Sequence, residues 1–179
     1  MIVAKVGGSL YDWPRLGPAL RAWISSQAEP VLLFPGGGDA ADVVRSWDRV
    51  HSLGEEEAHW LAIRSLSLAA HFLHRLLPGL PVVEGPTPGI LDPYPYFRNP
   101  SRDRGSGPPH TWSVTSDSLS LWVAIHANAS KLVLLKSAYA PDADWAEAGF
   151  VDAHFPLLMA GANLEVEAVD LRTRERPAA

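Results

Sequence analysis

The 179-residue sequence contains no cysteine. This absence excludes disulfide bonds, thiolate metal sites and a cysteine nucleophile, and it favours a reducing compartment. The first residues also lack a basic region and a small-residue cleavage site, so we predict no signal peptide. From these absences we expect a cytoplasmic protein.

Long apolar runs and an excess of positive charge are missing as well. Polar or charged residues interrupt every apolar run well before the roughly 18 residues that a membrane span needs. The net charge of -5 and the isoelectric point near 5.8 argue against a nucleic acid or an anionic membrane as a partner. Any phosphate site must therefore be built locally. With 47% hydrophobic residues, the chain is typical of one globular domain, which we expect over residues 1–179.

Two common nucleotide-binding motifs, G-x-x-x-x-G-K-[ST] and G-x-G-x-x-G, do not occur. Instead, glycine-rich turns follow two apolar segments, at Gly7-Gly8-Ser9 and at Gly36-Gly37-Gly38. Helical patterns come after both turns, so a β-α-β unit with parallel strands is predicted. The first helix is expected to begin near Asp12, as its cap, with Pro14 in the first turn. Ligands bind at the carboxyl ends of such strands, where backbone N–H groups can approach an anion closely. The alternative is a pair of tight turns without a ligand.

A long helix is predicted from Gly54 to Leu77. It opens with three glutamates, and its apolar residues occupy more than one face. We therefore expect burial on two sides, by the sheet and by a second subunit in a homo-oligomer. His71 and His74 have a spacing that could hold a metal, but no carboxylate or third histidine accompanies them, so we favour packing or surface roles.

The remaining chain predicts further strands over residues 81–84, 131–136 and 164–171, a helix capped by Thr115 or Ser116, and a short helix within 151–160. Together these elements predict an α/β fold, a three-layer α/β/α sandwich with a mainly parallel central sheet. Residues 85–110 are rich in proline and glycine, with aromatic and arginine side chains among them. They predict either a lid over a substrate, placed at 92–109, or a surface excursion.

Three charged residues stand at the ends of predicted elements. Lys5 and Lys136 lie at the carboxyl ends of two strands, and Asp117 begins a helix. Phosphoryl transfer needs positive charge and N–H donors around the transferred group, and these residues with the glycine turns would supply both. The alternative is two surface lysines and an ordinary first-turn acid.

Four separated motifs resemble, in their order and spacing, the amino acid kinase family, the fold of acetylglutamate, aspartate and uridylate kinases. The motifs are Lys5-x-Gly7-Gly8-Ser9, Gly36-Gly37-Gly38, Thr115-Ser116-Asp117 and Lys136-Ser137. The resemblance implies that the glycine loops flank the phosphoryl group, that the lysines neutralise it and that the aspartate orients both lysines. Within the family, the chain is most similar to short archaeal-type kinases that phosphorylate an aminomethylfuran phosphate in methanofuran-type or tetrahydromethanopterin-linked one-carbon cofactor synthesis.

The resemblance also implies the site residues and the ligands. It assigns catalysis to Lys5, Asp117 and Lys136, phosphate and nucleotide binding to Gly7, Gly8, Ser9, Thr115, Ser116 and Ser137, and acceptor binding to Gly36, Gly37, Gly38 and Arg45. ATP would be the phosphoryl donor, Mg²⁺ would accompany its phosphates, and the acceptor would be a small molecule that is itself a phosphomonoester.

One departure from the family concerns the region after Lys136. Only 43 residues follow it, fewer than family members usually devote to nucleotide binding. We therefore expect an abbreviated C-terminal nucleotide-binding part. The alternative function is a non-catalytic ligand-binding or regulatory protein on the same fold.

Overall fold

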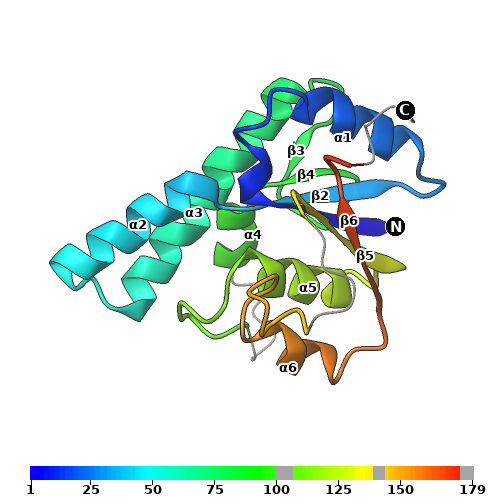
Figure 1. The fold of residues 1–179 in the computed structure, drawn as a ribbon. Coiled ribbons are helices and arrows are strands. Elements are labelled where there is room, and N and C mark those ends of the chain that lie inside the picture. The colour runs from blue at the N-terminus through cyan, green and yellow to red at the C-terminus, as the bar shows by residue number, and fades with distance from the viewer. Residues whose placement is uncertain (100–106, 139–143, 174–179) are drawn as a thin grey trace.

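The computed structural model describes residues 1–99, 107–138 and 144–173 (Figure 1). Its strands are β1 (Ile2–Val6), β2 (Val31–Pro35), β3 (Val82–Val83), β4 (Gly89–Leu91), β5 (Lys131–Lys136) and β6 (Glu165–Asp170). Its helices are the 3-10 turn η1 (Gly8–Leu10), α1 (Leu16–Ser25), α2 (Gly38–His51), α3 (Glu55–Leu76), α4 (Pro93–Arg98), α5 (Ser116–His126) and α6 (Phe155–Met159).

The strands form one parallel sheet in the order β3-β4-β2-β1-β5-β6. The two glycine-ended strands, β1 and β2, are neighbours, and β5 pairs with the other side of β1. β1 and β2 are buried along their whole length, as their continuous apolar sequences predict. The carboxyl ends of three adjacent strands therefore meet at the centre of one sheet edge.

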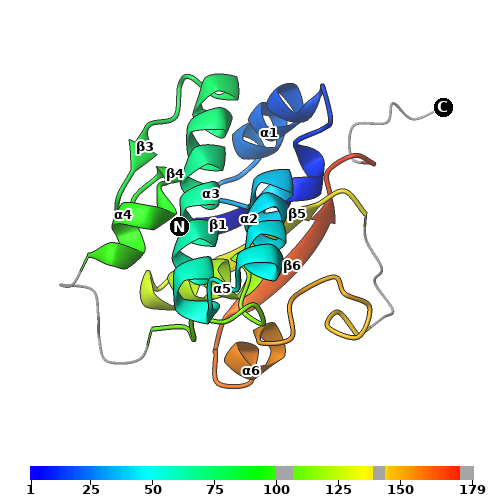
Figure 2. The same cartoon turned by 90° about the vertical axis from the view of Figure 1, so that its left-hand side faces the viewer.

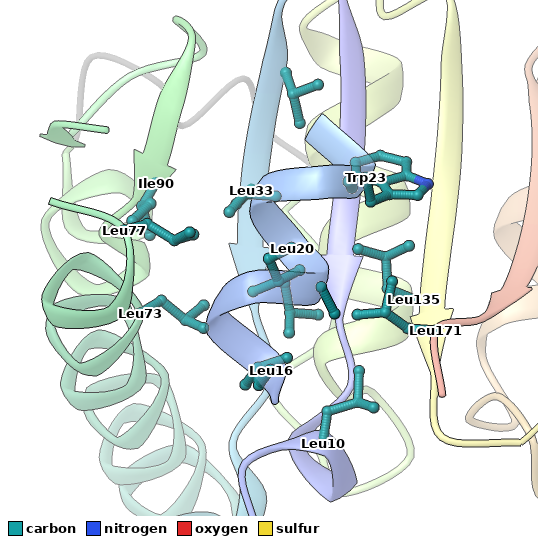
Figure 3. Packing of buried hydrophobic residues seen from close by; sticks show 14 of the residues in the cluster. Leu10, Leu16, Leu20, Trp23, Leu33, Leu73, Leu77, Ile90, Leu135 and Leu171 are labelled. Carbon is teal, nitrogen blue, oxygen red and sulfur yellow. The ribbon is translucent and has the colours of Figure 1, made fainter. Parts of the chain in front are cut away.

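Helices cover both faces of the sheet, which confirms the predicted three-layer arrangement (Figure 1). One face packs against α1, where Leu16, Leu20 and Trp23 meet inward-facing strand residues such as Leu33 and Leu135 (Figure 3). The other face packs against α4, α5 and α6. Alternate residues of each central strand belong to the two cores, because successive strand side chains point to opposite faces.

The long helix α3 contributes to both cores. Ile63 and Leu66 lie in the core on the α5 side, whereas Ala70, Leu73 and the following Leu77 lie in the core on the α1 side. Figure 2 shows this helix running across the end of the layers, with α2 packed against it. Its broad apolar surface is thus buried largely within its own chain. Two large apolar side chains of α3 remain exposed, Leu68 at 64% and Phe72 at 38%.

Two sequence predictions need correction. Residues 85–110 are not one irregular connection, because they contain β4, which lies between β3 and β2, and α4, in which Tyr96 is buried. Part of the predicted lid is therefore packed helix, and residues 100–106 of it lie outside the described residues. The first helix begins at Leu16 rather than near Asp12, whose carboxylate pairs with Arg172 at 2.7 Å instead of capping the helix.

Candidate active site

Strand register brings Lys5 and Lys136 to the same face of the sheet. Lys5 lies opposite Leu134 in the β1–β5 pairing, and Lys136 is two positions further along β5. Side chains two positions apart on a strand share a face. Leu132 and Leu134 point into the core beneath α5, so Lys136 points to the α5 side of the sheet, and Lys5 does the same, like its neighbour Val3.

Asp117, in the first turn of α5, holds both lysines. Its Oδ1 atom lies 2.9 Å from Lys5 Nζ and 2.9 Å from Lys136 Nζ. Lys5 and Asp117 are nearly fully buried, with exposed fractions of 4% and 7%. The three groups carry a net charge of about +1 when all are ionised, which leaves the site attractive to an anion. The predicted triad of Lys5, Asp117 and Lys136 is therefore assembled in the structure.

Burial and charge shift two of the three pKa values in the triad. Burial raises the pKa of Asp117, but the charges of Lys5 and Lys136 lower it by more, so the net direction is downward. Burial, followed by the repulsion from Lys5, lowers the pKa of Lys136 to about 8. The Lys136 ammonium therefore loses its proton at a lower pH than an exposed lysine does.

The two glycine turns meet backbone to backbone. Gly7 donates its N–H to Leu135 O at 2.8 Å, and Gly36 donates its N–H to Val6 O at 2.9 Å, so both turns are fixed to the ends of central strands. A Cβ atom on Gly8 would lie 2.4 Å from Gly38 N, and one on Gly36 would lie 2.7 Å from Gly8 N. Only residues without a side chain allow this approach.

A cleft of about 340 Å³ opens beside the triad, between α2, α3 and residues 111–119. It brings together nine of the predicted site residues: Lys5, Gly8, Ser9, Gly37, Gly38, Arg45, Thr115, Ser116 and Asp117. Arg45 pairs with Asp42 at 2.7 Å, and its guanidinium carbon lies 4.9 Å from the centre of the Trp112 ring. Gly7, Gly36, Lys136 and Ser137 do not line this cleft, and Ser137 hydrogen-bonds the hydroxyl of Ser9 at 2.8 Å.

Sequence reasoning missed two further cleft residues, His59 and Trp112. His59 is 7% exposed and stacks on His110, with ring centres 4.2 Å apart. Burial, and next the proximity of His110, lower the pKa of His59 to about 4, so its ring is uncharged at neutral pH. Trp112 donates its indole N–H to Asp48 at 2.8 Å. The available sequence signal was the presence of aromatic residues within 107–115. Nothing in the sequence predicted that this segment lies against α2 and α3.

The predicted capping role of the Thr115 or Ser116 side chain is not observed. The N-terminus of α5 is bound instead by Asp152, whose Oδ2 accepts hydrogen bonds from Thr115 N, Thr115 Oγ1 and Ser118 N at 2.8–3.0 Å. Asp152 comes from the segment after β5 and was not singled out in the sequence. The only local sequence signal for Asp152 was its position at the start of a predicted short helix, where aspartate is a common cap.

No group of three or more histidine or acidic side chains within residues 1–99, 107–138 and 144–173 is arranged to hold an ion. His74 donates a hydrogen bond from Nδ1 to Leu80 O at 2.8 Å, and the exposed His71 lies 3.6 Å from the Asp92 carboxylate. The same ranges contain no helix with the length and apolarity of a membrane span.

Comparison with solved structures identifies the fold. The UMP kinase of Bacillus anthracis matches with a TM-score of 0.64 at 13% identity, over 96% of this chain and 86% of that chain. A uridylate kinase from Archaeoglobus fulgidus matches with a TM-score of 0.51 at 16% identity, over 80% and 68% of the two chains. The chain therefore has the fold of these nucleotide kinases, which confirms the predicted fold class.

A sequence relative is more specific. The chain is 31% identical over 133 residues to the [5-(aminomethyl)furan-3-yl]methyl phosphate kinase of Methanocaldococcus jannaschii. The match includes 69% of this chain but spans only 59% of the relative's length. No family model matches the sequence. The resemblance inferred from the four motifs thus agrees with both kinds of comparison.

We predict that Gly8→Ala lowers the free energy of unfolding by about 1–3 kcal/mol, because the added methyl group collides with the backbone of Gly38. Urea denaturation would show this change as a lower unfolding midpoint. Gly79→Ala is the matched control, since nothing lies within 4 Å of a Cβ at that position. Equal midpoints for the two variants would contradict the backbone contact.

We also predict that the Lys136 side chain titrates near pH 8 in the free protein. The chain has only three lysines, Lys5, Lys131 and Lys136, so isotope-labelled lysine gives an NMR spectrum that single substitutions can assign. Asp117→Asn should lower the pKa of Lys136 further, because the carboxylate that favours its charged form is gone. A pKa unchanged by that substitution would show that the pair is not formed in solution.

Proposed function

We propose that this protein is an ATP-dependent small-molecule kinase. The observation that carries the proposal is the buried triad, in which one oxygen of Asp117 is shared by Lys5 and Lys136 beside two glycine turns. The similarity to an aminomethylfuran phosphate kinase supports the same activity. We place the protein in the cytoplasm, where ATP is available and where reducing conditions are compatible with a chain that has no cysteine.

The chemistry requires an acceptor oxygen to attack the γ-phosphorus of ATP as the bond to the ADP oxygen breaks. Negative charge spreads over the equatorial oxygens of the group in transfer. The ammonium groups of Lys5 and Lys136 would neutralise that charge, and the glycine turns would offer backbone N–H donors. Asp117 keeps both lysines in place, because its single Oδ1 atom contacts both.

The donor would bind at the edge formed by Gly8, Ser9, Lys136 and Ser137. The hydroxyls of Ser9 and Ser137 already meet across this edge, which joins the first glycine turn to the end of β5. Mg²⁺ would enter with the ATP phosphates and help neutralise them, since no described cluster of side chains provides a cage for it. Residues 139–143, which follow this edge, lie outside the described residues.

The acceptor would occupy the cleft beside the triad. We propose an acceptor of the kind named for the relative, an aminomethylfuran phosphate, so that the product is a diphosphate. Its phosphate would lie toward Lys5 and the glycine turns, and its planar ring toward Trp112 and the uncharged His59. The volume of about 340 Å³ suits a molecule of this size.

We propose a homodimer as the assembled form. The exposed Leu68 and Phe72 of α3, with the Tyr11 ring 5.4 Å from that of Phe72, form an apolar surface that no described part of the chain covers. A second copy is the occupant we infer, since the surface is continuous with a 580 Å³ groove lined by Tyr11, Leu68 and Phe72.

We predict that Lys136→Met, and separately Lys5→Met, lower kcat for phosphoryl transfer by about 10²-fold or more. Each change removes one positive charge and keeps the side-chain stem. Lys131→Met is the control, because Lys131 lies at the opposite end of β5 and pairs with Glu167. The assay follows ADP release with the aminomethylfuran phosphate as acceptor. Tight ATP binding without turnover on this acceptor would favour the non-catalytic alternative.

We predict that Leu68→Asp shifts the protein from dimer to monomer in sedimentation velocity at micromolar concentration. Leu157→Asp is the matched control, because Leu157 is 70% exposed on the distant helix α6. A wild-type protein that sediments as a monomer would overturn the dimer.

A further inference from the structure

Asp152 connects the N-termini of two helices. Besides the three hydrogen bonds to Oδ2 from α5, its Oδ1 accepts the hydroxyl of Ser118 and the backbone N–H groups of His154 and Phe155 at the start of α6. Six donors thus converge on one carboxylate, two of them at His154 and Phe155, where α6 starts, and four on residues 115–118. Carboxylates at helix N-termini also gain from the helix dipole.

The residues that Asp152 holds surround the catalytic aspartate. Thr115 and Ser118 lie two positions before and one position after Asp117, and Ser118 is fully buried. The side chain of Asp117 is therefore presented to the lysines from a helix turn whose backbone Asp152 fixes on both sides. Asp152 itself does not line the cleft.

The same segment also contacts Lys136. The carbonyl oxygen of Phe150 accepts a hydrogen bond from Lys136 Nζ at 2.5 Å, and the Phe150 ring lies 4.8 Å from that nitrogen. Val151, between Phe150 and Asp152, is buried in the core beneath α5. One short stretch, residues 150–155, thus touches the second lysine, supports the turn that carries the aspartate and begins α6.

We propose that Asp152 is a positioning residue of the active site, which acts through Thr115 and Ser118 to hold Asp117 against Lys5 and Lys136. This inference rests on the proposed kinase function for its effect on turnover. The contacts themselves assign the role, because removing the carboxylate frees the first turn of α5 and leaves backbone N–H groups without acceptors. Residues 150–155 therefore support the triad through their contacts with Lys136 and with the first turn of α5.

The test compares Asp152→Asn with Asp144→Asn. The amide keeps the shape of the side chain but turns one acceptor into a donor facing N–H groups. Asp144 is the matched control, because its carboxylate accepts two backbone N–H groups, from Ala146 and Glu147, and none of its hydrogen bonds to described residues reaches α5. For Asp152→Asn we expect kcat to fall about tenfold or more, with KM for ATP changed less than about threefold. Asp144→Asn should retain both constants.

A second readout does not depend on turnover. In Asp152→Asn, the NMR-measured pKa of Lys136 should move downward, toward its value in Asp117→Asn, because the carboxylate of Asp117 is no longer held beside it. Among the residues that the structure describes, the charged groups that face Lys136 are Lys5 and Asp117. If the wild-type protein transfers no phosphoryl group, the proposed function fails, and this titration still decides the role of Asp152.

Ser118→Ala keeps the proposal testable if Asp152→Asn does not fold. It removes one of the same hydrogen bonds from the α5 side, and we expect a smaller effect on kcat and on the pKa of Lys136 in the same direction. Ser130→Ala serves as its control, since the hydroxyl of Ser130 contacts only Met1 and Glu29 among the hydrogen bonds of the described residues. A folded Asp152→Asn with unchanged kcat and an unchanged Lys136 pKa would overturn the proposal.

Discussion

The candidate site depends on one oxygen atom, Oδ1 of Asp117, which contacts the ammonium groups of both Lys5 and Lys136. Removing three charges from water is costly, and an ion pair in the interior does not by itself repay that cost. Such an arrangement makes physical sense where a further anion completes it, because the three groups leave one positive charge unbalanced. This cost agrees with the proposal that the triad serves to bind an anion rather than to add stability.

The backbone segments around the triad converge on the same edge of the sheet. Parallel strands β1, β2 and β5 deliver their carboxyl ends to one edge, and the turns after β1 and β2 touch through Gly8 and Gly38. One wall of the cleft is therefore formed by Lys5 together with Gly8, Gly37 and Gly38 of the two turns. The opposite wall comes from α3 and residues 111–119, with the aromatic Trp112 and the uncharged His59. These two walls are the reason for placing the proposed acceptor, a planar ring that carries a phosphate, in this cleft.

Several features were predictable because they depend on local rules. Continuous apolar runs predicted buried parallel strands, glycine clusters after strands predicted an anion-facing edge, and a helix from 54 to 77 followed from its periodicity. Strand β4 and helix α4 were missed, because three residues of strand among prolines carry no periodic signal. The cap of α5 was assigned to Thr115 or Ser116 for a similar reason, since local capping rules consider only residues next to the helix.

The sequence by itself determined the chemistry that is present: two lysines at strand ends, an acid at a helix start, and glycines where side chains would block an approach. Tertiary structure alone decided which of these groups meet. The register of β1 against β5 sets Lys5 and Lys136 on one face, and a shift of one residue would turn one lysine to the opposite core. The same holds for Asp152, which reaches Thr115 across 37 positions of sequence. Contacts over such distances depend on how whole elements pack, and no local pattern encodes them.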